Sequence, residues 1–317
     1  MSKIILVTGA SGYIGGETML RLKDLGYTVI GVDLRTPPLQ LLGVPDRFYQ
    51  EDFASKFGIE LLDKFCPDAV VHCAGTSLVG PSLSAPNKYY DNNFVKTKIF
   101  LDAMISRGLQ SRFIFSSSAA VYGEPVMVPC REEDPMLPIS PYGESKVMVE
   151  MMLAAYSKAY NLDYIAFRYF NACGADSQGR HGQESGATHI IARVLESICH
   201  KSEFVLFGKD YPTDDGTCVR DYIHVEDLAD AHIAAINPGI PSGVYNLGNS
   251  QGISNMQIIL KAEEITNKRV NIVHGPNRPG DPAVLTASAD RFHAICDWRP
   301  KYDINAMISH AWHWYNR

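Results

Sequence analysis

Short apolar runs, separated by longer helix-like segments, restrict what this chain can fold into more than any other feature of its sequence. The runs read "KIILVTG", "TVIGVD", "AVVHCAG", "RFIFSSS" and "DYIAFRYF". Each run is continuous rather than alternating with polar residues, which is typical of strands covered on both faces. Regular alternation of such strands with helices indicates a parallel sheet between two layers of helices. The sequence therefore predicts an α/β fold with a doubly wound parallel sheet.

The character of the sequence changes at about Asn171, where loop-rich stretches such as "NACGADSQGRHGQESG" begin. We expect residues 1–170 to form the domain that holds the sheet and residues 171–317 to form a smaller C-terminal substrate domain. One later run, "GVYNLGN" at residues 243–249, reads as a further strand of the first sheet. The second domain is therefore expected to be discontinuous.

The composition excludes several classes of function. The chain has 317 residues, 46% of them hydrophobic, and a net charge of -6. This fits a globular protein and gives no general attraction to nucleic acid or to an anionic membrane. The sequence contains no run of lysine or arginine and no apolar run as long as a membrane span. The first apolar run is also too short for a signal peptide.

Seven cysteines are scattered along the chain without paired spacing, and several lie inside apolar runs such as "VVHCAG". This pattern is typical of reduced cysteines rather than of a disulfide framework. We therefore expect a cytoplasmic protein, and we predict no metal site.

A glycine-rich turn, "GASGYIG", directly follows the first apolar run. Gly9, Gly12 and Gly15 stand three residues apart, and positions without side chains let the backbone approach a pyrophosphate at the start of the next helix. An ordinary strand-to-helix turn is the alternative. The place of the turn between a strand and an amphipathic helix favours dinucleotide binding and, with it, a Rossmann-type sheet.

Two acidic residues are candidates for binding the adenosine half of the dinucleotide. Asp33 follows Gly15 by eighteen residues, near the separation at which a carboxylate reaches the ribose 2'-hydroxyl. It would repel a 2'-phosphate, so NAD is favoured over NADP, although Arg35 weakens this preference. Asp52 in "QEDF" is expected to meet the adenine amino group, and a solvated loop acid is the alternative.

The stretch "SPYGESK" predicts the start of a helix, with Ser140 as the capping residue and Pro141 in the first turn. Tyr142 and Lys146 are four residues apart and therefore share one face of that helix. A nearby ammonium group favours the phenolate form of a tyrosine, which makes Tyr142 a candidate general base for a sugar or alcohol hydroxyl. If the pair is considered alone, an exposed helical pair is an equally good interpretation.

A second catalytic candidate comes from "FIFSSSAAVYG", a predicted strand that ends in three serines. The carboxyl end of a strand is where an open α/β sheet places groups that bind ligands. We predict that Ser118 holds the reacting oxygen while Tyr142 takes its proton. Ser116 and Ser117 are expected to serve packing or backbone hydrogen bonding.

Seven segments extend these patterns to nearly the whole chain: "VTGASGYIGG", "YYDNN", "FIFSSSAAVYG", "SPYGESK", "RYFNACGA", "FGKDYPTDDGTCVRDYIHVEDLADAH" and "RPGDPA". In this order they resemble the extended short-chain dehydrogenase/reductase superfamily and, within it, the UDP-glucose 4-epimerase family. The resemblance implies tightly held NAD that takes a hydride from C4 of a UDP-linked hexose and returns it to the other face of a 4-keto sugar. UDP-glucose and UDP-galactose would thereby be interconverted.

The resemblance also implies which residues contact each ligand. The implied cofactor-binding residues are Gly9, Gly12, Tyr13, Ile14, Gly15, Asp33, Asp52, Phe53, Cys73, Ala74, Gly75, Asn92, Tyr142, Lys146 and Tyr169. The implied substrate-binding residues are Ser118, Tyr142, Phe170, Asn171, His189, Phe207, Arg220, Arg278, Asp281 and Val284.

Within the substrate set, the resemblance gives Arg220 and Arg278 to the diphosphate and Phe207 to the uracil. Asn171 and Phe170 would lie beside the sugar-phosphate and Asp281 near the ribose. The arginine fork suits phosphate oxygens. For Arg220, an ion pair with Asp221 or Asp227 is the alternative, and we expect His224 and Asp227 to be structural.

Three positions depart from the family or bear on its range of substrates. Ser77 in "CAGTSLVG" stands where many relatives have lysine, and "LRTPPLQ" replaces the usual run after Asp33. We therefore expect the adenosine end of the cofactor to be held differently. Val284 leaves room beside the 2-substituent of the sugar, so UDP-N-acetylglucosamine is expected to be accepted too.

Other functions on the same fold stay open. A 4-epimerase of another UDP sugar, a pentose or a hexosamine, fits the same motifs. A nucleotide-sugar 4,6-dehydratase would need acidic residues after Ser118, where this chain has Ala119 and Ala120. An NAD-binding regulator would have lost the tyrosine or the lysine.

The resemblance also implies a homodimer. Two segments, "YYDNNFVKTKIFLDAMISRG" and "KVMVEMMLAAYSKAY", have wide apolar faces, which in the family pack across a two-fold axis. The alternative is that each monomer covers these faces itself.

Overall fold

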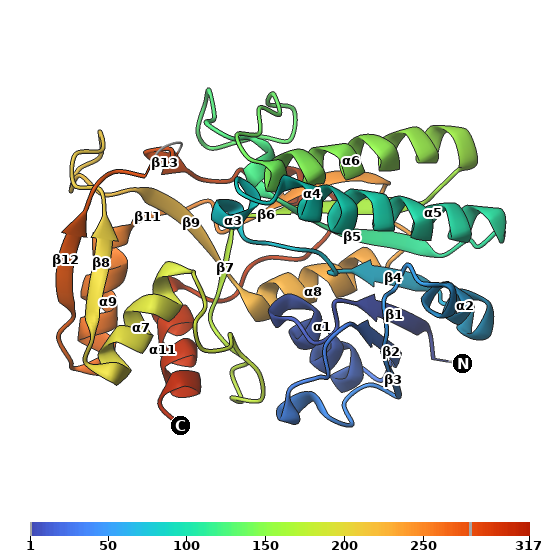
Figure 1. The fold of residues 1–317 in the computed structure, drawn as a ribbon, viewed down its shortest axis with the longest axis horizontal. Helices are drawn as coiled ribbons and strands as arrows, with labels where there is room; N and C mark the ends of the chain where they lie inside the picture. The colour runs from blue at the N-terminus through green and yellow to red at the C-terminus, as the bar shows by residue number, and fades with distance from the viewer. Residues whose placement is uncertain (1, 279–280) are drawn as a thin grey trace. The chain divides into compact units, whose positions relative to one another are not determined.

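The computed structural model describes residues 2–278 and 281–317, and the chain divides into two compact units (Figure 1). Unit 1 comprises the described residues up to Gly123, with Met136–Arg168 and Ala229–Tyr245. Unit 2 comprises Glu124–Pro135, Tyr169–Leu228 and the described part of Asn246–Arg317. The chain thus passes between the units several times. The expected functional domains, residues 1–170 and 171–317, stay a prediction.

Unit 1 is built on a seven-stranded sheet of described residues with the order β10-β6-β5-β4-β1-β2-β3. The strands are β1 (Ile4–Thr8), β2 (Thr28–Asp33), β3 (Arg47–Gln50), β4 (Ala69–His72), β5 (Arg112–Ser118), β6 (Tyr164–Tyr169) and β10 (Gly243–Leu247). The β1 pairings with β2 and β4 are parallel, as are the β2–β3 and β4–β5 pairings. The predicted doubly wound parallel sheet is confirmed, and the run at residues 243–249 supplies its edge strand β10.

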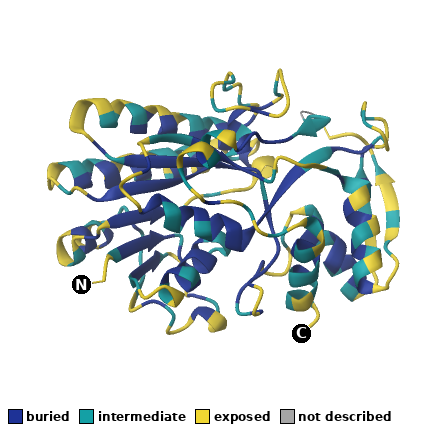
Figure 2. Cartoon of the chain, turned by 180° about the vertical axis from the view of Figure 1, so that it is seen from behind, coloured by how far each residue is buried: buried dark blue, intermediate teal, exposed yellow. Residues whose placement is uncertain are grey.

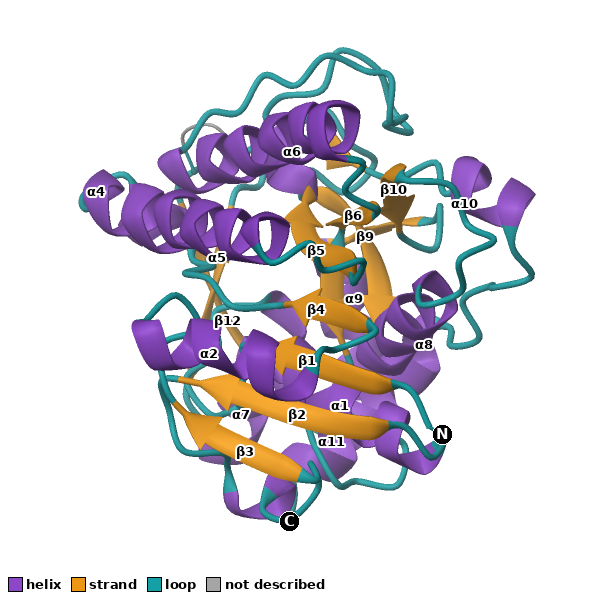
Figure 3. Cartoon of the chain, turned by 90° about the vertical axis from the view of Figure 1, so that its right-hand side faces the viewer, coloured by secondary structure: helices purple, strands orange, loops and turns teal. Residues whose placement is uncertain are grey.

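Helices cover both faces of this sheet, as Figure 3 shows, with α1 and α8 on one face and α2, α5 and α6 on the other. They span α1 (Tyr13–Asp24), α2 (Lys56–Phe65), α3 (Val79–Ser82), α4 (Pro86–Tyr89), α5 (Lys96–Ser106), α6 (Pro141–Tyr160) and α8 (Val225–Ala235). Short helical turns η1 (Leu39–Leu41), η2 (Tyr90–Val95) and η3 (Ala119–Val121) join them, and η2 is π-helical. Gly26 and Gly108 have positive φ just beyond α1 and α5, where a left-handed residue ends a helix.

The edge strand β3 is half-buried or exposed. The inner strands β4, β5 and β6 are buried along nearly their whole length, as Figure 2 shows in dark blue. This explains their continuous apolar sequences, because both faces of each strand are covered. The hydrophobic core between the sheet and helices α2, α5 and α6 includes Leu62, Phe100, Phe113 and Leu153. The core fixes the strand ends that carry the site.

Unit 2 contains smaller sheets and its own core. Its strands are β7 (Asn171–Cys173), β8 (Glu203–Phe207), β9 (Val219–His224), β11 (Gly252–Ser254), β12 (Asn271–Gly275) and β13 (Val284–Leu285). Strand β9 pairs with β7, β11 and β13, and β8 pairs with β12. Helices α7 (Ile190–His200), α9 (Asn255–Thr266), α10 (Asp290–Ile295) and α11 (Ile304–Tyr315) complete the unit. Its core includes Leu195, Phe204, Ile258 and Ile308.

Two further predictions concern the environment of the chain. Within the described residues, helices that combine the length and the apolar character needed to cross a membrane do not occur. The cysteines form no disulfide among those residues, and most of their thiols are buried or half-buried.

Candidate active site

The glycine-rich turn lies at the carboxyl end of β1, where the order of the sheet reverses between β1 and β4. Gly9 has a φ of +70°, and a Cβ there would lie 2.6 Å from the backbone of Cys73 and Ala74, which follow β4. A Cβ on Gly15 would lie 2.2 Å from the carbonyl oxygen of Gly9. A side chain at Gly9 would therefore push the glycine-rich turn away from the loop after β4, and a side chain at Gly15 would distort the turn itself. These two loops border the ligand crevice of such a sheet.

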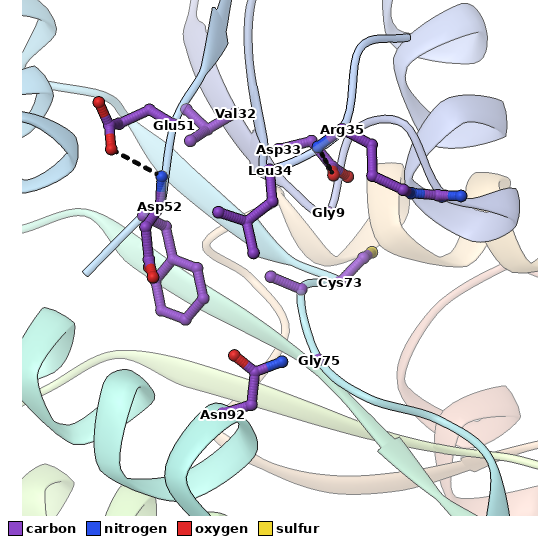
Figure 4. A pocket seen from close by; sticks show the side chains of 13 residues that line it. Gly9, Val32, Asp33, Leu34, Arg35, Glu51, Asp52, Cys73, Gly75 and Asn92 are labelled. Atoms are coloured by element: carbon purple, nitrogen blue, oxygen red, sulfur yellow. Dashed lines mark hydrogen bonds between the residues drawn. The ribbon is translucent and has the colours of Figure 1, made fainter. Parts of the chain in front are cut away.

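A cavity of about 280 Å³ opens at this point of unit 1 (Figure 4). It is lined by Gly9, Gly12, Val32, Asp33, Leu34, Arg35, Glu51, Asp52, Phe53, Cys73, Ala74, Gly75 and Asn92. Nine of the predicted cofactor-binding residues are therefore brought together here. Tyr13, Ile14 and Gly15 follow in the first turn of α1, while Tyr169 ends β6. The other four lining residues, Val32, Leu34, Arg35 and Glu51, are not among the predicted cofactor-binding residues.

Asp33 is tied to the glycine-rich turn through its carboxylate. One oxygen accepts a hydrogen bond from the Ser11 backbone N–H at 2.9 Å, and the other accepts from the Arg35 N–H at 2.8 Å. Ser11 and Arg35 are also linked in both directions, because Ser11 Oγ donates to the Arg35 carbonyl and Arg35 Nη2 donates to the Ser11 carbonyl. The segment after Asp33 is therefore anchored to the turn by this chain's own residues.

Asp52 is half-buried, lines the cavity and has a partner of opposite charge. Its Oδ2 accepts a hydrogen bond from Lys96 Nζ of α5 at 2.6 Å. Asn92 also lines the cavity, and its amide donates to Thr76 Oγ1 at 2.9 Å. Both contacts join the η2–α5 region to the rim of the cavity.

Helix α6 begins as predicted, with Pro141 in its first turn and Ser140 Oγ accepting from the Gly143 N–H at 3.2 Å. Tyr142 is 9% exposed and Lys146 6% exposed, so the exposed-pair interpretation is wrong. Lys146 Nζ donates to the Ser116 carbonyl oxygen at 2.8 Å. A Cβ on Gly75 would lie 3.7 Å from that Nζ. The Lys146 ammonium therefore reaches the edge of the cavity.

Burial dominates the electrostatics of both side chains of the pair. Burial raises the pKa of Tyr142, a hydrogen bond with Ser118 opposes that rise, and Tyr89 adds to it. Burial also lowers the pKa of Lys146 to about 8, against opposing contributions from Cys73 and Glu150. The removal of water therefore disfavours the charged form of each side chain.

The three serines at the end of β5 have separate partners. Ser118 caps the turn η3 by accepting from the Ala120 N–H at 3.2 Å, and it forms the hydrogen bond with Tyr142 noted above. Ser116 Oγ donates to Cys73 Sγ at 3.2 Å, and Ser117 Oγ donates to the carboxylate of Glu150. The structure thus brings Ser118, Tyr142 and Lys146 together within unit 1.

In unit 2, Arg220 of β9 pairs with the carboxylate of Asp281. Asp221 and Asp227, the alternative partners, form other hydrogen bonds. Asp221 instead accepts three backbone N–H groups, and burial raises its pKa to about 6. Asp227 accepts two backbone N–H groups near the start of α11. Arg220, assigned to the diphosphate, and Asp281, assigned to the ribose, therefore form an ion pair with each other in unit 2.

Two aromatic or imidazole groups of the predicted substrate set also have defined partners. The Arg278 guanidinium lies 4.1 Å from the ring centroid of Phe207, a cation–π contact. Gln183 Nε2 lies 2.7 Å from His189 Nδ1, and burial lowers the pKa of His189. The imidazole of His189 is therefore neutral at pH 7, with Nδ1 engaged by an amide.

The remaining predicted substrate residues of unit 2 lie on or beside β7 and β9. Asn171 Nδ2 donates to the Asp221 carbonyl at 2.8 Å. Phe170 is buried. Val284 is half-buried and pairs with Val219 in the β13–β9 ladder.

Comparison with known proteins identifies the family. Residues 5–248 match the NAD dependent epimerase/dehydratase family. The chain is 41% identical over 322 residues to a UDP-glucose 4-epimerase of Halalkalibacterium halodurans, covering 98% of this chain and 95% of that protein. The chain belongs to the NAD dependent epimerase/dehydratase family.

Solved structures of family members agree with this assignment. The UDP-glucose 4-epimerase of Brucella ovis in complex with NAD is 36% identical, with a TM-score of 0.93 over 99% of this chain and 98% of that chain. The Bifidobacterium longum UDP-glucose 4-epimerase in complex with NAD+ and UDP is 33% identical, with a TM-score of 0.92 over 99% and 98%. The resemblance drawn from the motifs, the Rossmann-type fold and NAD as cofactor are confirmed.

The residues of this family member fit the cofactor. The close approach of Gly9 to Ala74 leaves no room for a side chain at Gly9, as a pyrophosphate site requires. The Asp33 carboxylate faces the same cavity. Sequence reasoning missed Ser11, although it lies inside the quoted glycine motif, and Lys96, for which no local signal exists.

Proposed function

We propose that this protein is a UDP-glucose 4-epimerase, which interconverts UDP-glucose and UDP-galactose through a 4-keto sugar. The observation that carries the proposal is the burial of Tyr142 and Lys146 beside the half-buried Ser118, with Lys146 at the edge of the nucleotide cavity. Full-length similarity to UDP-glucose 4-epimerases supports the choice of substrate.

In this proposal each residue of the site acts on a stated atom. Tyr142 removes the proton of the sugar 4-hydroxyl, and the same phenol returns it when the reaction is completed. Ser118 holds the 4-oxygen by a hydrogen bond. Lys146 places a positive charge beside the phenol and so favours loss of its proton. When bound, NAD supplies reversible acceptance of the hydrogen and two electrons from C4, so that no external reductant is consumed.

The cofactor is proposed to be held by the cavity residues described above. Gly9, Gly12 and Gly15 let the backbone and the start of α1 meet the pyrophosphate. Asp33 binds the ribose hydroxyls of NAD, and Asp52, oriented by Lys96, binds the adenine amino group. Residues Tyr13, Ile14, Phe53, Cys73, Ala74, Gly75, Asn92, Tyr142, Lys146 and Tyr169 complete the proposed set.

The UDP sugar is proposed to be held mainly by unit 2. Arg220 and Arg278 bind the diphosphate, and Phe207 stacks near the uracil. Asp281, which pairs with Arg220 in the structure, lies near the ribose in this assignment. Phe170, Asn171 and His189 are proposed to contact the sugar-phosphate, with Val284 beside the 2-substituent.

Two other enzyme functions are weighed against this one. A 4-epimerase restricted to a UDP-pentose or UDP-hexosamine would use the same residues. A 4,6-dehydratase is less well supported, because Ala119 and Ala120 offer no acid or base in the turn η3 after Ser118. Acceptance of UDP-N-acetylglucosamine is part of our proposal, and pure enzyme that epimerises UDP-glucose but not this sugar would reject it.

A homodimer is proposed from the outer faces of α5 and α6. Val95, Ile99, Met148 and Met151 are each about two-fifths exposed or more. These side chains would be covered by the same helices of a second copy. A monomer by light scattering at micromolar concentration would contradict the dimer. We also propose a cytoplasmic location, because the cysteines are scattered and form no disulfide among the described residues.

The test of the proposed function uses the purified protein with NAD and UDP-galactose. Inversion at C4 is followed by NMR, and the near-ultraviolet absorbance of reduced nicotinamide reports the first half of the reaction. Tyr142→Phe is expected to slow inversion by about a hundredfold or more, because general base catalysis is lost. Tyr160→Phe, at the exposed end of the same helix, is the matched control and should keep the original rate.

Two results would reject the proposal. One is full activity in Tyr142→Phe. The other is a wild-type protein that inverts neither UDP-galactose nor UDP-glucose, and turnover of a UDP-pentose alone would then favour the alternative epimerase.

A further inference from the structure

A cluster of buried polar side chains lies two helical turns beyond Tyr142. Tyr142, Lys146 and Glu150 are spaced by four residues and share one face of α6. Glu150 and Arg168 are each 3% exposed, although charged residues are almost never fully buried unless they are paired. We call Glu150, Arg168, Tyr122 and Ser117 the Glu150 cluster.

The contacts of the Glu150 cluster join α6 to three other segments of unit 1. Arg168 of β6 donates from Nη2 to Glu150 Oε2 at 2.7 Å and from Nε to both carboxylate oxygens. Arg168 Nη1 donates to the hydroxyl of Tyr122, just after η3, at 2.8 Å. Ser117 of β5 donates from Oγ to Glu150 Oε1. One carboxylate on α6 therefore holds β5 and β6 directly, and through Arg168 it holds the turn after η3.

Stability alone does not explain such a pair. Removing two charges from water costs several kcal/mol per ion before their attraction is counted, and apolar residues of similar volume often stabilise a fold equally well. A bidentate ion pair does, however, fix distance and angle more narrowly than apolar packing. The Glu150 cluster is thus better suited to holding elements in register than to stabilising them.

The elements held in register carry the proposed catalytic groups. Lys146 on α6 donates to the carbonyl of Ser116, and Glu150 one turn later accepts from the side chain of Ser117. Side chains from consecutive turns of α6 therefore form hydrogen bonds with consecutive residues of β5, Ser116 and Ser117. The next residue along β5 is Ser118.

We propose that Glu150 is a positioning residue for the oxidation at C4: its carboxylate holds α6 against β5 so that Tyr142 and Lys146 keep their places beside Ser118. The inference rests on the proposed function. It adds a residue that acts through others and does not itself touch the substrate.

The charges around Lys146 give this role a signature in the pH dependence. His72 and Cys73 face Lys146 from β4, the Ser116 carbonyl and the Phe115 ring from β5, and Tyr142 and Glu150 from its own helix. His72 is neutral, because burial lowers its pKa to about 3, and burial raises the pKa of Cys73 to about 11.

Glu150 is the carboxylate among these groups, and it raises the pKa of Lys146. Glutamine in its place removes that negative charge and leaves the Arg168 guanidinium without its carboxylate. Both changes lower the pKa of Lys146. The alkaline limb of the activity profile should therefore move to lower pH.

The experiment compares Glu150→Gln with a matched control, Asp163→Asn, in the full-length enzyme saturated with NAD. Like Glu150, Asp163 accepts hydrogen bonds from an arginine and a serine. Arg112, at the start of β5, donates to both carboxylate oxygens of Asp163, and Ser242 donates to one of them. The Asp163 carboxylate therefore binds the first residue of β5, at the opposite end of that strand from Ser117 and Ser118. The measurements are kcat and KM for UDP-glucose across pH, with amide hydrogen exchange of residues 141–150.

We expect Glu150→Gln to lower kcat by about tenfold to a hundredfold, the effect of a misplacement of about 1 Å, with KM within about twofold. Its alkaline limb moves to lower pH, and amides at the start of α6 exchange faster. Asp163→Asn keeps kcat, the pH profile and the exchange of α6 near wild type. Unchanged kcat and pH profile in folded Glu150→Gln, or equal effects in both variants, overturns the proposal.

If Glu150→Gln does not fold, Ser117→Ala decides. It removes the β5 donor but keeps the Glu150–Arg168 pair, and the proposal requires a lower kcat with faster exchange at the start of α6. Wild-type values of both would overturn the proposal. A wild-type enzyme without epimerase activity would instead reject the proposed function, so the two failures are distinguishable.

Discussion

Replacing Lys146 with methionine is expected to abolish epimerase activity and yet to stabilise the folded protein near neutral pH. The side chain is 6% exposed, and burial lowers the pKa of its ammonium group from 10.5 to about 8. The folded chain therefore holds this charge less favourably than the unfolded chain does. Methionine has a similar length and no charge to bury.

The magnitude follows from two opposing contributions. The difference between 10.5 and about 8 corresponds to about 3 kcal/mol of unfavourable interaction in the folded state. Against this, the Ser116 carbonyl loses its donor, at a cost of about 1–3 kcal/mol for a buried acceptor. We therefore expect Lys146→Met to raise the free energy of unfolding by up to about 2 kcal/mol at pH 7.

The pH dependence separates this explanation from a simple change in packing. Between pH 8 and 10.5 the unfolded wild-type chain keeps a proton on Lys146 that the folded chain has released, so wild-type stability rises with pH in that window. The variant lacks this group. Its advantage should therefore shrink by about 2 kcal/mol between about pH 8 and about pH 9.5.

Urea unfolding followed by circular dichroism, in nucleotide-free protein from about pH 7 to about pH 9.5, measures both effects. Lys98→Met is the control, because the Lys98 side chain is 50% exposed and pairs with Asp102 on the surface of α5. Its effect on the free energy of unfolding should be the same at every pH tested. A stability difference between Lys146→Met and wild type that did not change with pH would refute the reasoning.

Two further changes test the nucleotide and sugar sites. Gly15→Ala should weaken NAD binding by about tenfold or more in calorimetry, because its Cβ would lie 2.2 Å from the Gly9 carbonyl and displace the turn. Gly80→Ala meets nothing within 4 Å and should bind NAD as wild type does. Val284→Tyr should remove turnover of UDP-N-acetylglucosamine while UDP-glucose is still epimerised, since a larger side chain fills the space of the acetamido group. Loss of both activities, or of neither, would contradict the role of Val284.

Most of the fold could be predicted because its signals are local. Strand β4 and its neighbours are buried on both faces, so each shows as a continuous apolar run. Gly26 and Gly108 take the positive φ that ends a helix, and Ser140 caps α6 through its own side chain. Each of these features depends on residues within a few positions of one another.

Features that depend on distant residues could not be predicted in the same way. Arg220 and Asp281 pair across sixty-one positions, and a motif assigns each to a ligand without showing that they meet. The π-helical turn at Tyr90–Val95 precedes α5 where the apolar pattern indicates an uninterrupted helix. The link between Ser11 and Arg35 joins two loops whose sequences carry no mark of each other.

The Glu150 cluster lies between these cases, because part of it was open to prediction. Tyr142, Lys146 and Glu150 recur at intervals of four, so a buried Lys146 implies that Glu150 is buried beside it. Arg168 is likewise the one charged residue within the continuous apolar run "YIAFRYF". A buried charge needs a partner of opposite sign, and for Glu150 the buried candidates are Lys146 on its own helix and Arg168 on β6. Burial and charge therefore indicate that Glu150 has a basic partner, whereas the choice of Arg168 and the further contact from Ser117 required the structure.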